Sequence, residues 1–169
     1  LSLVFQEPEQ AQHFTVNSPL DLHSETISAA YLKSPLCVTP SQSVREVMEL
    51  LRDQKQGSAL VCDDNDLLGI FTERDALEIM AADGELDGPV EQVMSTDVMR
   101  LPLDASLSVA VRTMAFGGYR RLPILDEQGH PIGVCVATGI LRYLVDHFPE
   151  IVYTLPPEPH QTPQQREGA

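Results

Sequence analysis

The chain has 169 residues, 43% of them hydrophobic, so it can bury one core in a single domain or in one compact pair of subdomains. Its formal net charge of −14 argues against nucleic acid or an anionic membrane as the main partner, because both require a basic footprint. No apolar run approaches the roughly 18 residues of a membrane-spanning helix. The start, LSLVFQEPEQ, lacks the cationic and apolar regions of a secretion signal, so we expect a cytoplasmic protein.

The elements of the first half follow an irregular N-terminal arm, residues 1–26, which shows no sustained period. ISAAYL predicts a short helical lead-in, and LCV predicts a short strand. Ser43 is a candidate N-cap, and the residues that follow place one apolar face on a helix: Val44, Val47, Met48 and Leu51. SALVC and LLGIF flank the turn-forming cluster DDND and therefore predict a β-hairpin.

The stretch GIFTERDALEIM, residues 69–80, begins like a buried strand and continues with the apolar spacing of a helix. Thr72, Glu73, Arg74 and Asp75 lie at the junction, where the first backbone N–H groups of a helix have no partners. Thr72 can cap this helix while the two acids complement its dipole. The same junction can instead hold a phosphate or a ribose. The local sequence leaves both interpretations open.

The second half repeats the first at an offset of about 63 residues. Ser43 falls on Ser106, and one inserted residue in the second hairpin brings Gly69 onto Gly133. We therefore divide the chain into residues 27–89 and 90–148. Each follows a short helical lead-in and contains a strip of sheet and two amphipathic helices. Two such units can bury their apolar faces on each other in a pseudo-twofold pair. Residues 149–169 contain five prolines, which predicts an extended tail.

The repeated unit, the VTPSQSV entry, the RRLPILD strand and above all GIFTERD resemble tandem cystathionine-β-synthase (CBS) domains, the pair known as a Bateman module. The resemblance covers roughly residues 27–148. It implies an α+β fold in which two β-α-β-β-α repeats pack through their sheets with pseudo-twofold symmetry. It also implies two clefts that often bind AMP, ADP, ATP or S-adenosylmethionine, and modules that commonly pair into dimers.

The resemblance also implies a ligand site on the first copy. The family's motif matches Gly69, Ile70, Thr72 and Asp75. Glycine allows close backbone approach, Thr72 and the helix N-terminus can donate to phosphate, and the Asp75 carboxylate can accept from ribose hydroxyls. Backbone near Cys37 and Val38 is implied to meet the adenine edge.

The second copy departs from this motif, since Val136 replaces the hydroxyl and Gly139 replaces the acid. We therefore expect at most one good nucleotide site per chain. Arg120 and Arg121 occupy the place from which family members reach phosphate, and an arginine fork suits that role. The alternative for these two arginines is a solvated strand end, with Arg121 paired to a carboxylate.

The remaining candidate residues favour ordinary structural roles. DDND lacks the glycine and distant glutamate of a calcium loop, so a hairpin turn is expected there. The five histidines show no metal spacing, and we expect no metal site. The three cysteines, Cys37, Cys62 and Cys135, are odd in number and lie in apolar surroundings, which predicts free buried thiols. No catalytic motif is present, so we expect no enzyme activity and no required cofactor.

From these patterns and the resemblance we expect a regulatory module that senses an adenosine-containing ligand and signals through a shape change at its dimer interface. Its output is expected to lie in a target protein regulated in trans. The rival hypothesis is an interaction scaffold that keeps the fold but binds no nucleotide. The degenerate second motif and the acidity of the chain favour the rival.

Overall fold

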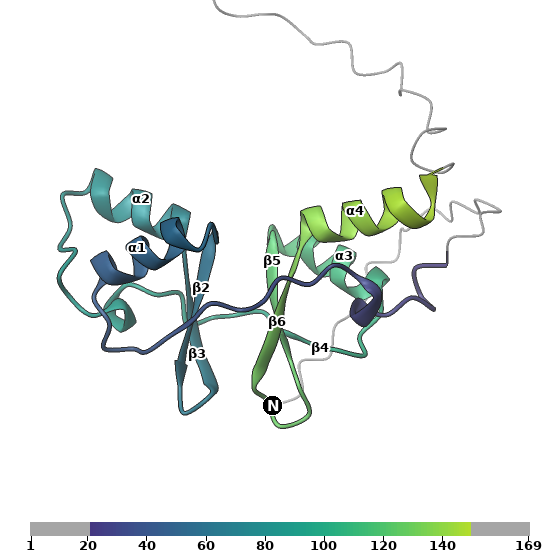
Figure 1. The fold of residues 1–169 in the computed structure, drawn as a ribbon, viewed down its shortest axis with the longest axis horizontal. Coiled ribbons are helices and arrows are strands. Elements are labelled where there is room, and N and C mark those ends of the chain that lie inside the picture. Colours follow the sequence, from purple (N-terminus) through teal and green to yellow (C-terminus); the bar gives the residue numbers. More distant parts are fainter. Residues whose placement is uncertain (1–20, 150–169) are drawn as a thin grey trace, which may run out of the picture.

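Each half of the chain folds into a short strand, a helix, an antiparallel hairpin and a second helix (Figure 1). The computed structural model describes residues 21–149, and the predicted tail and all but the last six residues of the predicted arm lie outside them. The elements of the first repeat are β1 (Cys37–Val38), α1 (Val44–Asp53), β2 (Ser58–Asp63), β3 (Asp66–Thr72) and α2 (Glu73–Ala81). Those of the second are β4 (Leu101–Pro102), α3 (Leu107–Gly117), β5 (Arg121–Leu125), β6 (Pro131–Val136) and α4 (Ala137–His147).

The strands form two three-stranded sheets with the same topology, in the orders β1-β2-β3 and β4-β5-β6. In each sheet the short first strand is parallel to the second, and the hairpin strands are antiparallel. The first hairpin turns at Asp64 and Asn65, whose φ angles of 45° and 78° are positive. A tight hairpin turn of this kind needs residues that tolerate left-handed backbone, and Asp and Asn do so. The DDND turn prediction is confirmed.

Side-chain caps fix where three of the four α-helices of residues 21–149 begin. Ser43 accepts a hydrogen bond from the Glu46 amide, and the Glu46 carboxylate accepts one from the Ser43 amide, which completes a capping box. Ser106 accepts from the Val109 amide at the start of α3. The predicted cap at Ser43 is therefore confirmed. Within the described residues, every helix is too short or too polar to cross a membrane.

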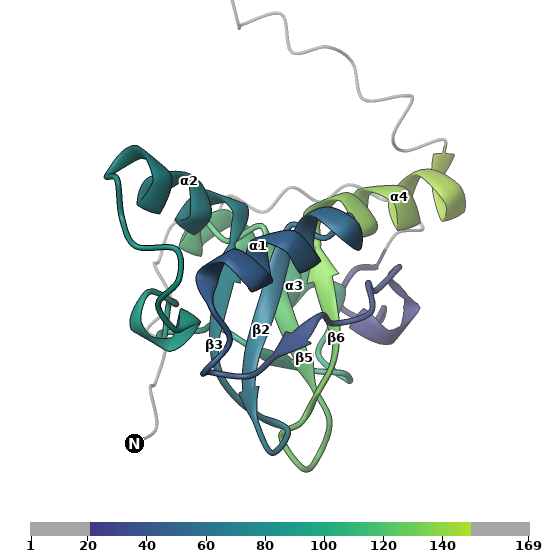
Figure 2. The ribbon, with the colours of Figure 1, turned by 60° about the vertical axis from the view of Figure 1, so that its left-hand side comes forward.

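Three groups of buried side chains hold the molecule together. One core lies within each repeat, around Phe71 in the first and around Leu122 in the second. A third cluster joins the two sheets through the side chains of Leu60, Cys62, Leu67, Val134 and Val136. Figure 1 shows the two hairpins side by side, with their turns at one end and α2 and α4 at the other, and Figure 2 gives a second view of this packing. The predicted packing of two repeats through their sheets is the observed one.

The two lead-in segments are exchanged between the repeats. The first, η1 (Ile27–Ala29), buries Ile27 in the core of the second repeat, and the Ile27 amide donates to the Ala105 carbonyl at 2.8 Å. The second, η2 (Val90–Gln92), buries Val90 in the core of the first repeat. Figure 1 shows the chain running from η1 across the molecule to β1. Each repeat is therefore completed by a segment that adjoins the other repeat in sequence.

Candidate ligand-binding cleft

Thr72 and Asp75 form a reciprocal cap at the start of α2. The Asp75 carboxylate accepts from the Thr72 amide at 2.7 Å and from the Thr72 hydroxyl at 2.8 Å. The Asp75 amide donates back to Thr72 Oγ1 at 3.4 Å. Both side chains are half-buried. The capping interpretation of this junction is therefore realised, and it holds the two side chains in one fixed arrangement.

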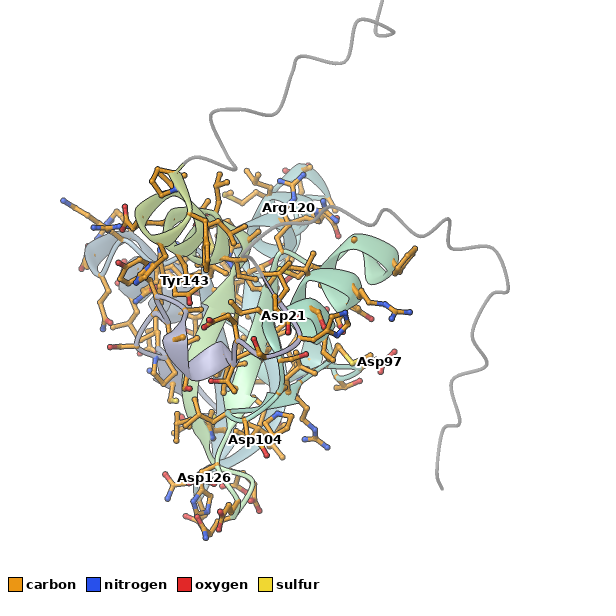
Figure 3. All side chains as sticks on the ribbon, turned by 90° about the vertical axis from the view of Figure 1, so that its right-hand side faces the viewer. Asp21, Asp97, Asp104, Arg120, Asp126 and Tyr143 are labelled. Atoms are coloured by element: carbon orange, nitrogen blue, oxygen red, sulfur yellow. The ribbon has the colours of Figure 1, made fainter. Side chains whose placement is uncertain are left out.

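The same junction forms one wall of a cleft of about 720 Å³, a size typical of small-molecule sites. The cleft lies between the repeats and is lined by residues from both: Lys33, Ile70, Thr72, Glu73, Arg74, Asp75, Leu77, Ser95, Asp97, Val98, Met99, Gly118, Tyr119, Arg120, Arg121, Val136, Ala137 and Thr138. Figure 3 shows Arg120 and Asp126 at opposite ends of the molecule, so the cleft wall that holds Arg120 lies far from the second hairpin turn. Five of the eight predicted site residues line it: Ile70, Thr72, Asp75, Arg120 and Arg121.

Gly69 shapes the cleft without lining it. A Cβ on Gly69 would lie 2.4 Å from the Met94 sulfur and 3.0 Å from the Ser95 carbonyl oxygen. This close approach lets the Ile70 amide donate to the Ser95 carbonyl at 3.0 Å, and the Ser95 amide donate to the Ile70 carbonyl at 3.0 Å. Glycine fits here because the Met94 side chain and the Ser95 carbonyl lie where its side chain would be. The result is a second cleft wall that begins at Ser95.

Cys37 and Val38 are not among the residues that line this cleft, so their contact with an adenine edge stays a prediction. β1 pairs with β2 opposite Leu60 and Val61, and the Val38 side chain is buried in the core of the first repeat. The segment that leads into β4 lines the cleft together with the Thr72–Asp75 junction, through Ser95, Asp97, Val98 and Met99. Gly69 was the sequence feature that pointed to this neighbour, since a glycine inside a strand marks close backbone approach.

The cysteines are free thiols, as predicted, but one is not buried. Cys62 and Cys135 are buried, whereas Cys37 is exposed on the edge strand β1. Burial raises the pKa of the Cys135 thiol to about 11. No cluster of three or more metal-binding side chains occurs among the residues that the structure describes.

The cleft concentrates positive charge in an acidic chain. The whole chain carries 11 Lys and Arg against 25 Asp and Glu. Four of those cations line the cleft, Lys33, Arg74, Arg120 and Arg121, against three acids, Glu73, Asp75 and Asp97. The Arg121 guanidinium lies 3.7 Å from the Glu73 carboxylate, which is the ion pair expected under the structural alternative for this residue. The local charge balance suits an anionic group.

The equivalent junction of the second repeat is occupied by the chain itself. A Cβ on Gly139 would lie 2.6 Å from the Tyr31 carbonyl oxygen, so the segment at Tyr31 fills the space that Asp75 takes in the first repeat. The Tyr31 hydroxyl donates to Asp146 at 2.9 Å, and the Arg142 guanidinium lies 5.0 Å from the Tyr31 ring centroid. The N-cap of α4 is Val136, and the helix has no side-chain cap. The second junction therefore has neither the carboxylate nor room for one at the position of Asp75, although Val136, Ala137 and Thr138 line the cleft.

Comparisons with known proteins agree with this architecture. The family model described as "CBS domain" matches the chain twice, over residues 27–82 and 90–146. A CBS domain-containing protein of Bacillus subtilis, YhcV, is 36% identical over 105 residues, which is 62% of this chain and 74% of that protein. A 17.7 kDa protein of Acidianus ambivalens is 32% identical over 110 residues, covering 64% of this chain and 66% of that one.

Solved structures share the fold. A conserved protein from Pyrococcus horikoshii superposes with a TM-score of 0.66 at 27% identity, over 73% of this chain and 93% of that chain. The CBS-domain protein ATU1752 from Agrobacterium tumefaciens superposes with a TM-score of 0.60 at 28% identity, over 65% and 89%. The chain spans 66% or less of the length of the first three curated relatives it matches. With two matched repeats and this sheet-to-sheet packing, the chain belongs to the CBS domain family, as a tandem CBS pair.

Proposed function

We propose that this CBS pair is a regulatory module that senses an adenosine-containing ligand in the cleft built on Thr72 and Asp75. The observation that carries the proposal is the position of this junction, which faces the Ser95–Met99 backbone on one side and Arg120 and Arg121 on another. These groups supply the contacts that a nucleotide needs: a carboxylate for ribose hydroxyls, guanidinium groups for phosphate and backbone for the base edge.

The cleft also provides a route for signalling. Its walls come from both repeats, so a ligand that contacts both walls favours one relative arrangement of the repeats over another. A ligand shifts such an equilibrium by its difference in affinity for the two arrangements. We propose that the output passes to a target protein in trans, that the module itself is not a catalyst, and that it works in the cytoplasm, which its free thiols favour.

Proteins of the same fold guide the choice of ligands to test. A CBS domain protein from Pyrobaculum aerophilum was solved in complex with AMP, and the CBS domain pair of MJ0100 was solved with 5′-methylthioadenosine and S-adenosyl-L-methionine. Both are under 25% identical to this chain. AMP, ADP, ATP and S-adenosylmethionine are therefore the probes of choice. The cationic wall of the cleft, Lys33, Arg74, Arg120 and Arg121, favours the three nucleotides that carry phosphate.

The alternative function is a scaffold that binds no nucleotide. Two observations favour it: the reciprocal cap satisfies Thr72 and Asp75 without a ligand, and the second junction is already filled by Tyr31. The cationic wall favours the sensor, because a scaffold gives no reason to gather four of 11 cations around one cleft.

A homodimer is the assembly that we propose for either function. The helices carry large apolar side chains that face outward, with Phe116 at 83% exposure, Leu77 at 63% and Leu141 at 57%. Leu77 and Leu141 are equivalent positions of the two repeats, so a second copy presents matching apolar groups to both.

Isothermal titration calorimetry of the full chain against AMP, ADP, ATP and S-adenosylmethionine tests the sensor. Saturable micromolar binding of at least one ligand is the expected result. An absence of heat with all four, from protein shown to be folded and free of copurified nucleotide, would contradict the sensor and leave the scaffold.

A further inference from the structure

The ion pair between Glu73 and Arg121 joins the two repeats. Glu73 is the first residue of α2 in the first repeat, and Arg121 is the first residue of β5 in the second. The distance between Arg121 Nη2 and Glu73 Oε2 is 3.7 Å. Among residues 21–149, every other ion pair connects two residues of the same repeat. This contact therefore reports directly on how the repeats sit against each other.

Gly57 provides the space for this contact. A Cβ on Gly57 would lie 2.1 Å from Arg121 Nη2 and 2.9 Å from Glu73 Oε2, so both charged groups rest against the Gly57 backbone. The Glu73 amide also donates to the Gly57 carbonyl at 3.3 Å. Any larger residue at position 57 would occupy the place of the guanidinium.

The two partners of the ion pair differ in how firmly they are held. The Arg121 side chain is 33% exposed, whereas the Glu73 side chain is 67% exposed. Both line the ligand cleft, next to Arg120 and Thr72. The carboxylate is thus the partner that can leave with the least rearrangement. An anion that enters the cleft competes with it for the same guanidinium.

We propose that Glu73 holds Arg121 before ligand binds and that an anionic group of the ligand takes its place, so that the charge of the ligand controls the contact between the repeats. This inference rests on the proposed function of the cleft. It predicts that AMP binds and breaks the contact, whereas adenosine, which carries no phosphate, occupies the cleft and leaves the contact in place.

The first test measures the ion pair in the full chain without ligand, by a double-mutant cycle of Glu73→Gln and Arg121→Gln in urea unfolding. The shifts of the urea midpoint in the two single variants should be non-additive. The double variant should be no less stable than the less stable of the two single variants. Gly57→Ala should remove the coupling although it changes no charge, and Gly88→Ala, whose Cβ would meet nothing closer than 3.8 Å, is the matched control. Additive shifts would overturn the proposal whatever the cleft binds.

The second test repeats the cycle on binding, with AMP and adenosine as probes in calorimetry. Glu73→Gln should tighten AMP binding by about two- to fivefold when Arg121 is present and leave adenosine affinity unchanged. In the Arg121→Gln background the same substitution, Glu73→Gln, should change the affinity for AMP only slightly. Equal tightening in both backgrounds would mean simple repulsion by Glu73 and would overturn the displacement. If the wild-type chain binds neither probe, the proposed function fails and the displacement fails with it, even where the first test finds the ion pair.

Discussion

The carbonyl oxygen of Tyr31 lies 2.6 Å from the point where Gly139 would carry a Cβ. This contact fills the second junction of the CBS pair, at the position equivalent to Asp75 in the first. Tyr31 is held there by its hydrogen bond to Asp146 and by the Arg142 guanidinium over its ring. The loss of the acid in the second repeat is therefore matched by a loss of space at that position, and both support our proposal of one ligand site per chain.

Gly139→Ala should destabilise the protein although Gly139 lies inside helix α4. In an open helix this change gains about 0.5–1 kcal/mol, because alanine loses less backbone entropy than glycine. Here the new methyl group meets the Tyr31 backbone, and overpacking of this kind costs about 1–3 kcal/mol. The free energy of unfolding in urea is the measurement, with Gly88→Ala as the control for an open position. A gain in stability by Gly139→Ala would show that Tyr31 does not occupy the second junction.

Two capping boxes make it possible to separate capping from ligand binding. Asp75 accepts from the Thr72 amide at 2.7 Å in α2, and Glu46 accepts from the Ser43 amide at 2.9 Å in α1. Asp75→Ala and Glu46→Ala should each lower the free energy of unfolding by about 0.5–2 kcal/mol, since each removes one half of a capping box. Urea unfolding measures both. A stability change in Glu46→Ala and none in Asp75→Ala would refute the capping role of Asp75.

Burial of Cys135 predicts a loss of stability at high pH. The pKa of this thiol is raised to about 11 from an ordinary value of 9.0, so the folded chain keeps its proton at pH values where the unfolded chain has lost it. The stabilising effect is present below about pH 9 and is lost as the pH rises toward 11. Urea unfolding between about pH 9 and 10.5 gives the free energy of unfolding as a function of pH. Its slope should be shallower in Cys135→Ala than in the wild-type chain, by up to about 1 kcal/mol per pH unit.

Val134→Ala is the control for the Cys135 experiment, because it removes buried volume from the same strand without removing a titratable group. Its pH slope should match that of the wild-type chain. An unchanged slope in Cys135→Ala would mean that the thiol is not protected by burial.

The exposed helix side chains predict how the dimer can be broken. Among residues 21–149 Phe116 is the most exposed large apolar side chain, at 83%, and it lies near the end of α3. If a second copy covers it, Phe116→Glu should shift the chain toward monomer in sedimentation velocity, because a carboxylate cannot be buried without a partner. Val109 is 43% exposed on the same helix, and Val109→Glu tests whether a second position on α3 also affects the dimer. A wild-type chain that sediments as a monomer at all concentrations would contradict the homodimer.

Local patterns in the sequence predicted the elements well, since capping and periodicity are decided within a few residues. Ser43 and Thr72 both cap the helices that follow them, and Asp64 and Asn65 form the turn that DDND indicated. The repeat itself predicted the pairing of two sheets, because one copy alone buries too little apolar surface.

The sequence could not show which segment faces which junction. The exchange of η1 and η2 between the repeats depends on the path of the chain across the molecule, and the sequence indicated only that a lead-in precedes each copy. The sequence likewise did not show that Ser95 lines the cleft, whereas Cys37 and Val38 do not. Gly69 is where the local sequence carried information about this long-range contact.

The most direct test of the sensor compares AMP binding by the wild-type chain, Asp75→Ala and Glu46→Ala in isothermal titration calorimetry. The two variants each lose one half of a capping box, but Asp75 lines the cleft and Glu46 lies on α1 outside it. We predict one AMP per chain in the wild-type protein and in Glu46→Ala, and no measurable binding in Asp75→Ala. Binding that survives in Asp75→Ala, or a second equal site per chain, would contradict it.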